Sequence, residues 1–466
     1  MASDELHAQV DHGPPRSIWL LPFAQQGHIN PLMQLGKALA LRGMHVTVLL
    51  PKNTASSSPA MDIPPLSVIG VDDELPPERS RGSNIRDSIE SMRNMQAPVA
   101  DLLARYCHRV SFIIYDAFMS WAVSVASEHS IPSSCFLTTG ATTCTIMYQM
   151  PSLIQRGILP FRADDNAPLH TIEVQGIDGA PVLTSQDFPM GMTLSATNFL
   201  FQLVVRISES LHNASSILVN TVEELELEAI AALRAHTPIY PVGPLLLLPG
   251  QASRLPINYW PEDDQCLPWL DAQAPRTVLF VSFGSVASVS LSQFQDLALG
   301  LEASGQPFLW VVRPDSINAP LQEALPDGFL DRTKNKGLII SWGPQLLILS
   351  HPSIGGFMTH GGWNSLTENI ATGSVPMICW PHVAEQRVNR FLVTSVWKIG
   401  LRLHHNEDGS VSKGEIARAV RELFNGQQST DLRNKSEEVS DIAKKAIAEG
   451  GSSHTNFEKL CNLLCA

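Results

Sequence analysis

Short apolar runs alternate with segments of helical period at the start of the chain. Residues 17–23 read Ser-Ile-Trp-Leu-Leu-Pro-Phe, which predicts a buried strand. The next segment repeats apolar residues on a helical period and stops near Gly43, so a helix is expected with Asn30 as its cap and Pro31 in its first turn. Residues 45–50 predict a second strand. A βαβ unit of this kind aligns its strands in parallel, so the pattern predicts a parallel α/β sheet.

The pattern recurs along the chain with one interruption. Further apolar runs at 110–115, 277–283, 307–313, 337–341, 354–359 and 375–380 predict more strands. Residues 245–265 have no period and are rich in Pro, Gly, Ser and charge, which predicts a linker. Because 466 residues exceed what one core usually holds, we expect two domains, at 1–244 (with 1–16 flexible) and 266–448, and a final helix at 449–466.

Composition and charge indicate which binding partners and which cellular compartment to expect. The net charge of −13 makes the chain a poor partner for nucleic acid or anionic membrane. Its seven cysteines form no C-x-x-C pair and are odd in number, which favours free thiols over a disulfide framework or a zinc site. The polar start resembles no signal peptide, and no apolar run approaches the length of a membrane span. We therefore expect a cytoplasmic protein, and a monomer.

The segment 342–386 concentrates polar and aromatic residues at predicted strand ends and helix starts. It reads WGPQLLILSHPSIGGFMTHGGWNSLTENIATGSVPMICWPHVAEQ. In open parallel sheets, ligands bind at such positions. Taken singly, these residues have simpler explanations: a buried Trp is usually core, Asn and Ser before a helix are usually caps, and a Glu in the first turn is usually a partner of the helix dipole.

The order of residues in this segment resembles the signature box of plant family 1 UDP-dependent glycosyltransferases. The matching parts are W-x-P-Q, H-P, G-G-F, T-H-x-G-W-N-S, a Glu three residues on, V-P-M, W-P and a closing acidic residue with Gln. The resemblance extends from Pro22 to the C-terminus. It implies a GT-B fold of two facing Rossmann-like domains, with acceptor mainly in the first, the UDP-sugar mainly in the second, and the last helix packed back on the first.

The resemblance implies a donor site in which each part of a UDP-sugar has a partner. Trp342 would stack on uracil, Gln345 would bond the base edge or ribose, and Glu368 would accept from ribose hydroxyls. The diphosphate would meet the start of a helix, together with His360 and a strand-to-helix turn. The remaining donor-site residues are Gly27, Thr138, Ser285, Trp363, Asn364, Ser365, Glu385 and Gln386. Thr138 and Ser285 could equally be ordinary turn or strand-end hydroxyls.

His28 and Asp116 are the expected catalytic pair. His28 lies in a motif similar to the family's P-x-x-x-x-G-H-x-x-P, and Asp116 ends a strand similar to the family's strand–Asp–helix segment. As a bare residue, His28 could also be an exposed residue at a helix start. A histidine can take the proton of an attacking hydroxyl, while a carboxylate behind the ring fixes its tautomer. One direct displacement of UDP inverts the anomeric centre.

These features predict an inverting glycosyltransferase that moves a hexose from UDP-glucose to a hydroxyl of a small lipophilic acceptor such as a flavonoid, another phenolic or a terpenoid. Trp363 with a closing Gln386 resembles members that use glucose. UDP-glucose is then a co-substrate, and no D-x-D motif suggests a metal or another cofactor. Candidate acceptor-pocket residues, each also explained as plain core, are Phe118, Met119, Met147 and Phe201.

The sequence departs from the family pattern at three places, and other functions stay open. Gly361 stands where many members carry Cys, Glu385 where Asp is also common, and Ser374 adds one residue to the usual Gly-Val-Pro. C-glycosylation of a phenolic ring and a non-catalytic nucleotide-sugar or small-molecule binding protein stay open. A dinucleotide oxidoreductase and a serine hydrolase are disfavoured because the chain contains neither G-x-G nor G-x-S-x-G.

Overall fold

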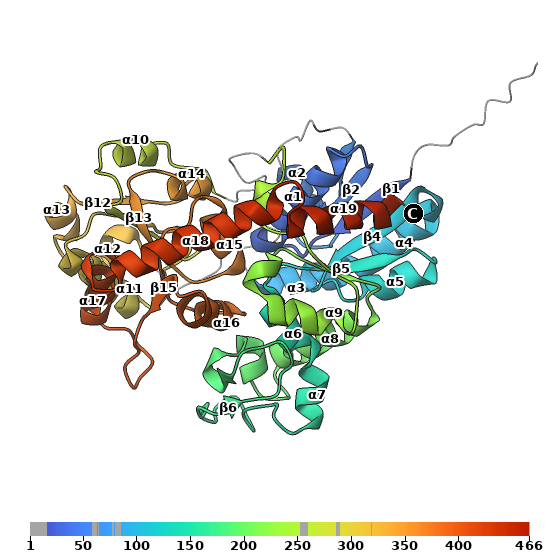
Figure 1. Ribbon diagram of the computed structural model, residues 1–466, viewed down its shortest axis with the longest axis horizontal. Coiled ribbons are helices and arrows are strands. Elements are labelled where there is room, and N and C mark those ends of the chain that lie inside the picture. The colour runs from blue at the N-terminus through green and yellow to red at the C-terminus, as the bar shows by residue number, and fades with distance from the viewer. Residues whose placement is uncertain are drawn as a thin grey trace, which may run out of the picture.

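The computed structural model describes residues 16–57, 63, 65–76, 79, 85–251, 260–285, 289–317 and 319–465. The expected flexible segment 1–16 lies outside these residues except for Arg16, as does the central part of the predicted linker, 252–259. Figure 1 shows two α/β domains side by side, with the last helices running across both.

The first domain is built on a parallel sheet. Its strands follow the order β3-β2-β1-β4-β5-β8-β9. Their bounds are β1 Ser17–Leu21, β2 Val46–Pro51, β3 Leu66–Val71, β4 Val110–Asp116, β5 Ser133–Leu137, β8 Ile217–Val219 and β9 Ile239–Pro241. A small antiparallel pair joins β6 Glu173–Val174 to β7 Leu183–Thr184. Strand β1 lies inside the sheet and pairs in parallel with β2 on one side and β4 on the other.

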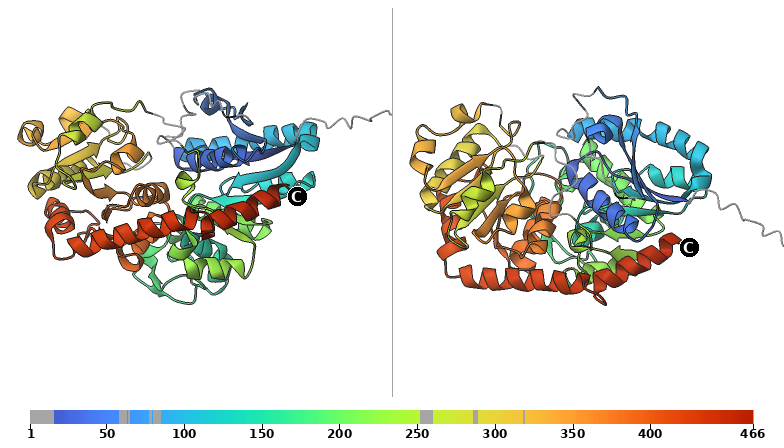
Figure 2. Two further views of the ribbon diagram at one scale, coloured as in Figure 1. Left: turned by 45° about the horizontal axis from the view of Figure 1, so that its top comes forward. Right: turned by 90° about the horizontal axis from the view of Figure 1, so that it is seen from above.

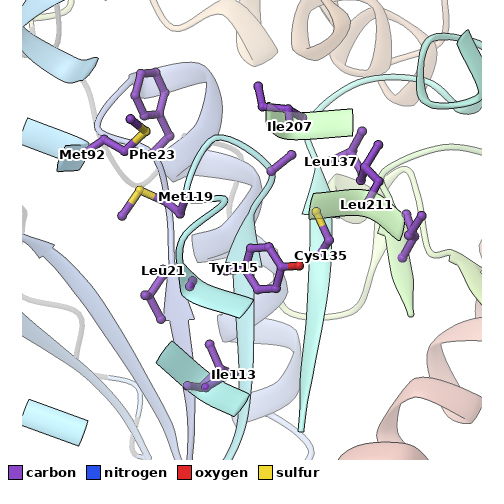
Figure 3. Close-up of a cluster of buried hydrophobic side chains, with 14 of the residues drawn as sticks. Leu21, Phe23, Met92, Ile113, Tyr115, Met119, Cys135, Leu137, Ile207 and Leu211 are labelled. Atoms are coloured by element: carbon purple, nitrogen blue, oxygen red, sulfur yellow. The ribbon is translucent and has the colours of Figure 1, made fainter. Parts of the chain in front are cut away.

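Both faces of this sheet are buried, which explains why its strands read as continuous apolar runs. In β1, Trp19 and Leu21 enter one hydrophobic cluster while Ile18 and Leu20 enter another. Figure 3 shows part of the first cluster, where Tyr115 of β4 and Cys135 of β5 lie among aliphatic side chains. The helices of the domain are α1 Gln26–Ala40, α2 Lys52–Ser57, α3 Ile85–Asn94, α4 Gln96–Tyr106, α5 Ala122–Glu128, α6 Ala141–Tyr148, α7 Met150–Gln155, α8 Phe199–Asn213 and α9 Leu227–Arg234.

The second domain repeats this plan with the strand order β12-β11-β10-β13-β14-β15, again parallel. The strands are β10 Val278–Ser282, β11 Phe308–Val311, β12 Gly337–Ile340, β13 Ile354–Thr359, β14 Met377–Cys379 and β15 Gly400–Arg402. Its helices are α10 Cys266–Asp271, α11 Leu291–Ser304, α12 Leu321–Ala324, α13 Phe329–Thr333, α14 Gln345–Leu349, α15 Trp363–Ala371, α16 Gln386–Phe391, α17 Lys413–Asn425 and α18 Ser429–Ile447. The five strands predicted for this half correspond closely to β10–β14, whereas the short strand β15 was not predicted.

The first helix begins earlier than predicted. Helix α1 starts at Gln26, so Asn30 is not its cap and Pro31 lies inside it. Gln25 provides the cap position, and its carbonyl accepts from the backbone N–H groups of His28 and Ile29. The prediction was wrong because Pro31 was assumed to need a first-turn position. A proline deeper in a helix removes one backbone hydrogen bond, to the carbonyl four residues before it, and here that carbonyl belongs to Gly27.

The chain passes between the domains at two places. The first is between Gln251, whose amide donates to Gln34 O in the first domain, and Asp263, whose N–H donates to Trp342 O in the second. The second is the junction of α18 with α19 (Ser452–Cys465). Figure 2 shows these two helices lying along both domains. Helix α18 packs into the second domain through Val439 and Ala443, whereas α19 covers the outer face of the first.

No helix in the described part of the chain is long and apolar enough to cross a membrane. All seven cysteines are unpaired.

Candidate active site

Polar side chains meet where three adjacent strands of the first sheet end. His28 lies in the first turn of α1 directly after β1, Asp116 is the last residue of β4, and Thr138 follows β5. Strands β1, β4 and β5 are neighbours in the sheet. Because the carboxyl ends of parallel strands share one edge, the fold brings these side chains together.

The imidazole of His28 is held by the two other side chains. Its Nδ1 lies 2.8 Å from Asp116 Oδ2 and 3.0 Å from Thr138 Oγ1. The other oxygen of Asp116 accepts from the Phe118 N–H at 2.9 Å, and this carboxylate is only 1% exposed. A carboxylate can only accept, so the proton sits on Nδ1 and the lone pair on Nε2. His28 thus has the tautomer that a general base needs.

Two aromatic rings fix the plane of this imidazole. Phe23 and Phe118 each meet the His28 ring edge to face, with centroids 5.1 Å away, and they stack on one another at 4.7 Å. The ring is therefore confined on its flanks by packing and at Nδ1 by hydrogen bonds. Its side chain keeps 20% of its surface exposed and lines a cavity between the domains.

Strand ends of the second sheet face the same cavity. Ser285 follows β10, Trp342 follows β12 and His360 follows β13, and all of them line it. Helix α15 begins directly after β13 and contributes Asn364, Ser365 and Glu368 to the cavity wall, and α14 contributes Gln345. The donor-site residues predicted from the sequence are thus brought to one place by the fold.

Gln345, Ser365 and Glu368 form one hydrogen-bonded group. The amide nitrogen of Gln345 donates to Ser365 Oγ at 3.1 Å and to Glu368 Oε2 at 2.5 Å. Glu368 is buried, and burial raises the pKa of its carboxyl to about 7, although the Gln345 hydrogen bond acts in the opposite direction. Its protonation therefore changes within the physiological range.

The raised pKa of Glu368 predicts a pH-dependent stability. From pH 4.5 to about 7, the folded carboxyl holds a proton that the unfolded chain releases, so its contribution to folding stability falls as pH rises. We expect Glu368→Gln to gain stability relative to wild type by up to about 3 kcal/mol across this window. Unfolding midpoints of both proteins at each end of the window measure this gain. A stability difference that does not change with pH would contradict the assignment.

His360 is enclosed by backbone and is uncharged. Added Cβ atoms at Gly284 and Gly362 would approach its ring to 2.6 and 2.4 Å, so the imidazole fits only because both positions are glycine. Burial lowers the pKa of His360 to about 3. This side chain can therefore offer a neutral N–H to an anionic ligand, but no positive charge.

The start of α15 also joins the two domains. Asn364 donates from Nδ2 to Gly27 O at 2.5 Å, and Trp363 donates from its indole to Asn220 O at 2.8 Å. The Gly27 carbonyl is the one that Pro31 leaves without a helical donor. The Trp363 ring also lies against Gly140, where a Cβ would come within 2.6 Å of it. Trp363 and Asn364 both line the cavity. The two hydrogen bonds described above, however, are made to the other domain and not to a ligand.

Polar side chains at the start of α16 make hydrogen bonds within the loop that precedes it and within the helix itself. Gln386 accepts through Oε1 from the N–H groups of His382 and Val383, at 2.8 and 2.9 Å. Glu385 accepts from Asn389 Nδ2 at 3.0 Å, and burial raises the pKa of its carboxyl. Both residues line the cavity.

The turn after α15 accommodates the additional residue, Ser374, without shifting the next strand. Gly373 and Ser374 both have positive φ, at 118° and 56°. The Asn369 side chain donates to Val375 O and accepts from Val375 N, which closes the turn. Strand β14 keeps its register with β13, and Trp380 N donates to Thr359 O at 2.8 Å. The insertion therefore leaves the strand that leads to Glu385 in line.

The cavity has a volume of about 450 Å³ and is lined by both domains. Its carboxylates are Asp116, Glu262, Glu368 and Glu385, and no Lys or Arg occurs among the described residues that line it. Within the described chain, no group of His, Cys, Asp and Glu side chains has an arrangement that could hold a metal ion.

The first-domain wall of the cavity differs in part from the predicted one. Phe118 and Met147 line it, whereas Met119 and Phe201 are buried in hydrophobic clusters and are absent from the lining. On α8 the lining face is Leu200, Leu203, Val204 and Ile207. That face follows the i, i+3, i+4, i+7 spacing, so helical periodicity was the signal that could have identified it. The lining also includes Gln25, Ile85, Ile89 and Met190, for which no motif gave a signal.

The chain is similar to known proteins over most of its length. Residues 83–434 match the model of the family described as UDP-glucoronosyl and UDP-glucosyl transferase. A 7-deoxyloganetin glucosyltransferase of Gardenia jasminoides is 34% identical over 95% of this chain and 96% of its own length.

Solved structures resemble nearly the whole chain. Phytolacca americana UGT2, complexed with UDP-2fluoro-glucose and pterostilbene, has a TM-score of 0.81 and 31% identity, and the match covers 97% of this chain and 100% of that one. Os79 from O. sativa, in complex with UDP, has a TM-score of 0.82 and 27% identity over 96% of this chain and 100% of its own.

Proposed function

Because the chain belongs to the family of plant UDP-dependent glycosyltransferases and has their GT-B fold, we propose that it transfers glucose from UDP-glucose to a hydroxyl of a small lipophilic plant metabolite, with inversion at the anomeric carbon. The chain is a UDP-glycosyltransferase. The roles of its residues and the class of acceptor are the parts that we propose.

The observation that carries the proposal is the His28–Asp116 pair on a cavity that both domains line. His28 Nε2 takes the proton of the acceptor hydroxyl as its oxygen bonds to the anomeric carbon. The bond from that carbon to the UDP oxygen breaks, and its electron pair leaves with UDP. Asp116 stabilises the imidazolium that forms on His28.

The second-domain wall suits a UDP-sugar in this mechanism. Trp342 offers an indole face to uracil, and Glu368 offers a carboxylate to the ribose hydroxyls. The N-terminus of α15, with the neutral N–H of His360, meets the negative charge that develops on the departing diphosphate. Glu385 and the Gln386 amide are proposed to bind hexose hydroxyls.

The first-domain wall supports a lipophilic acceptor. Phe118, Met147 and the α8 face give it an apolar surface beside His28. The Gardenia relative is named for an iridoid-type acceptor and the Phytolacca neighbour was solved with a stilbene, so phenolic and terpenoid alcohols are the acceptor classes we propose.

Incubation with UDP-glucose and a panel of phenolics, flavonoids and terpenoid alcohols tests the proposal. We expect UDP release together with a product heavier by one hexose and a β-anomeric signal in its NMR spectrum. Acid-stable products on phenols would indicate C-linkage instead. Binding of UDP-glucose without a product from any acceptor would favour a binding protein and contradict the proposal.

A further inference from the structure

One polar atom in the acceptor wall is buried, oriented and without a partner. Gln25 is 4% exposed and lines the cavity, and its Nε2 donates to Ser88 Oγ at 2.6 Å. The Ser88 hydroxyl in turn donates to Ala24 O at 2.9 Å. Because its proton is used there, Ser88 must accept from Gln25, so the amide nitrogen faces Ser88. The amide oxygen Oε1 is left without a hydrogen-bond partner in the structure.

The part of α3 next to Gln25 is apolar where it lines the cavity. Ser88 lies on α3 between Ile85 and Ile89, and both isoleucines line the cavity. A buried acceptor in such a wall has lost its water and gains from a ligand that donates to it. An amide oxygen can only accept a hydrogen bond, so the group that meets it is a donor such as a hydroxyl and not a carboxylate.

We propose that Gln25 is a specificity-determining residue that selects acceptors with a second hydroxyl, distinct from the one that His28 deprotonates. Gln25 begins the helix whose first turn holds His28, because its carbonyl accepts from the His28 N–H at 2.9 Å. The β1–α1 junction therefore carries both the base for the reacting hydroxyl and the acceptor for the second one. This inference rests on the proposed transfer from UDP-glucose.

Matched biphenyl acceptors test the proposal. Each carries one phenolic hydroxyl for transfer and, on the distal ring, a hydroxyl at the ortho, meta or para position. The comparison compounds carry hydrogen or a methoxy group at the same position; methoxy fills the space but cannot donate. We expect the kcat/KM of at least one dihydroxy compound to exceed that of its hydrogen and its methoxy comparison compound by about 10- to 100-fold.

Variants assign the preference to Gln25. Gln25→Met keeps the length of the side chain without the amide, and we expect it to bring the ratio of kcat/KM between paired acceptors to near one. Ser88→Ala removes the group that orients the amide, and we expect an intermediate ratio. Ile89→Val is the matched control, because it enlarges the cavity at the same wall without changing a polar atom. It should retain the wild-type ratio of kcat/KM between paired acceptors. UDP binding by calorimetry shows that each variant is folded.

The outcomes separate this inference from the function on which it rests. Transfer with equal kcat/KM for every matched pair in the wild type would overturn the role of Gln25 and leave the proposed function intact. So would a preference that survives in Gln25→Met. Absence of transfer to every acceptor, of any class, would overturn the proposed function itself. A preference for hydroxyl over methoxy that disappears only in the Gln25 and Ser88 variants supports the proposal.

Discussion

Replacing His28 with alanine is expected to lower kcat for sugar transfer by about 10²–10⁴-fold, the usual contribution of a positioned general base. The ring that would accept the proton is held by Asp116 at Nδ1 and flanked by Phe23 and Phe118, and all of this positioning is lost with the imidazole. Initial rates of UDP release with saturating UDP-glucose and acceptor measure the loss.

Two controls make this result specific to proton transfer. His28→Gln keeps a donor toward Asp116 but has no basic nitrogen, and its activity should fall as far as that of the alanine variant. UDP affinity should stay within a few-fold of the wild type in both, because the residues proposed to grip UDP belong to the second domain. Retention of more than a tenth of the activity in either variant would remove His28 from the role of base.

Asp116→Asn is expected to reduce kcat by about 10²–10⁴-fold through the tautomer of His28. The Asp116 carboxylate accepts from His28 at one oxygen and from the Phe118 N–H at the other. An asparagine that keeps its oxygen toward Phe118 turns its NH₂ group toward Nδ1. The ring proton then moves to Nε2, and the nitrogen that faces the acceptor can no longer accept a proton.

Nitrogen-15 chemical shifts of His28 distinguish this cause from a general disturbance of the site. They should report the proton on Nδ1 in the wild type and on Nε2 in Asp116→Asn. Thr138→Val removes the other contact at Nδ1 and leaves the carboxylate in place, so its loss of activity should be much smaller, about tenfold or less. An unchanged tautomer in an inactive Asp116→Asn protein would contradict the explanation.

The fold class was predictable from the sequence because each parallel strand is buried on both faces. Alternate residues of β1 enter different hydrophobic clusters, so the strand reads as an unbroken apolar run, and β10 does the same. The predicted GT-B fold is confirmed by the similarity to solved structures. Polar residues placed directly after such runs, such as Asp116 and His360, could be assigned to the cleft because strand ends converge there.

Other features depended on contacts that no local pattern encodes. The start of α1 was placed too late because the consequence of Pro31 appears only when Asn364 of the other domain donates to Gly27 O. Met119 and Phe201 are as apolar as Phe118, and only the packing of the surrounding helices decides which of them reaches the cavity. Gln25 gave no signal because its role depends on Ser88, far away in the sequence.

The two passages of the chain between the domains restrict how the cleft can open. The first lies between Gln251 and Asp263, and the second lies where α18 meets α19. The domains also contact one another at the start of α15, where Asn364 Nδ2 donates to Gly27 O. Any opening of the cleft that separates α15 from α1 must break this hydrogen bond, whose acceptor is the carbonyl that Pro31 leaves without a helical donor. The cost of separating the two domains there therefore includes this hydrogen bond and the one from the Trp363 indole to Asn220 O.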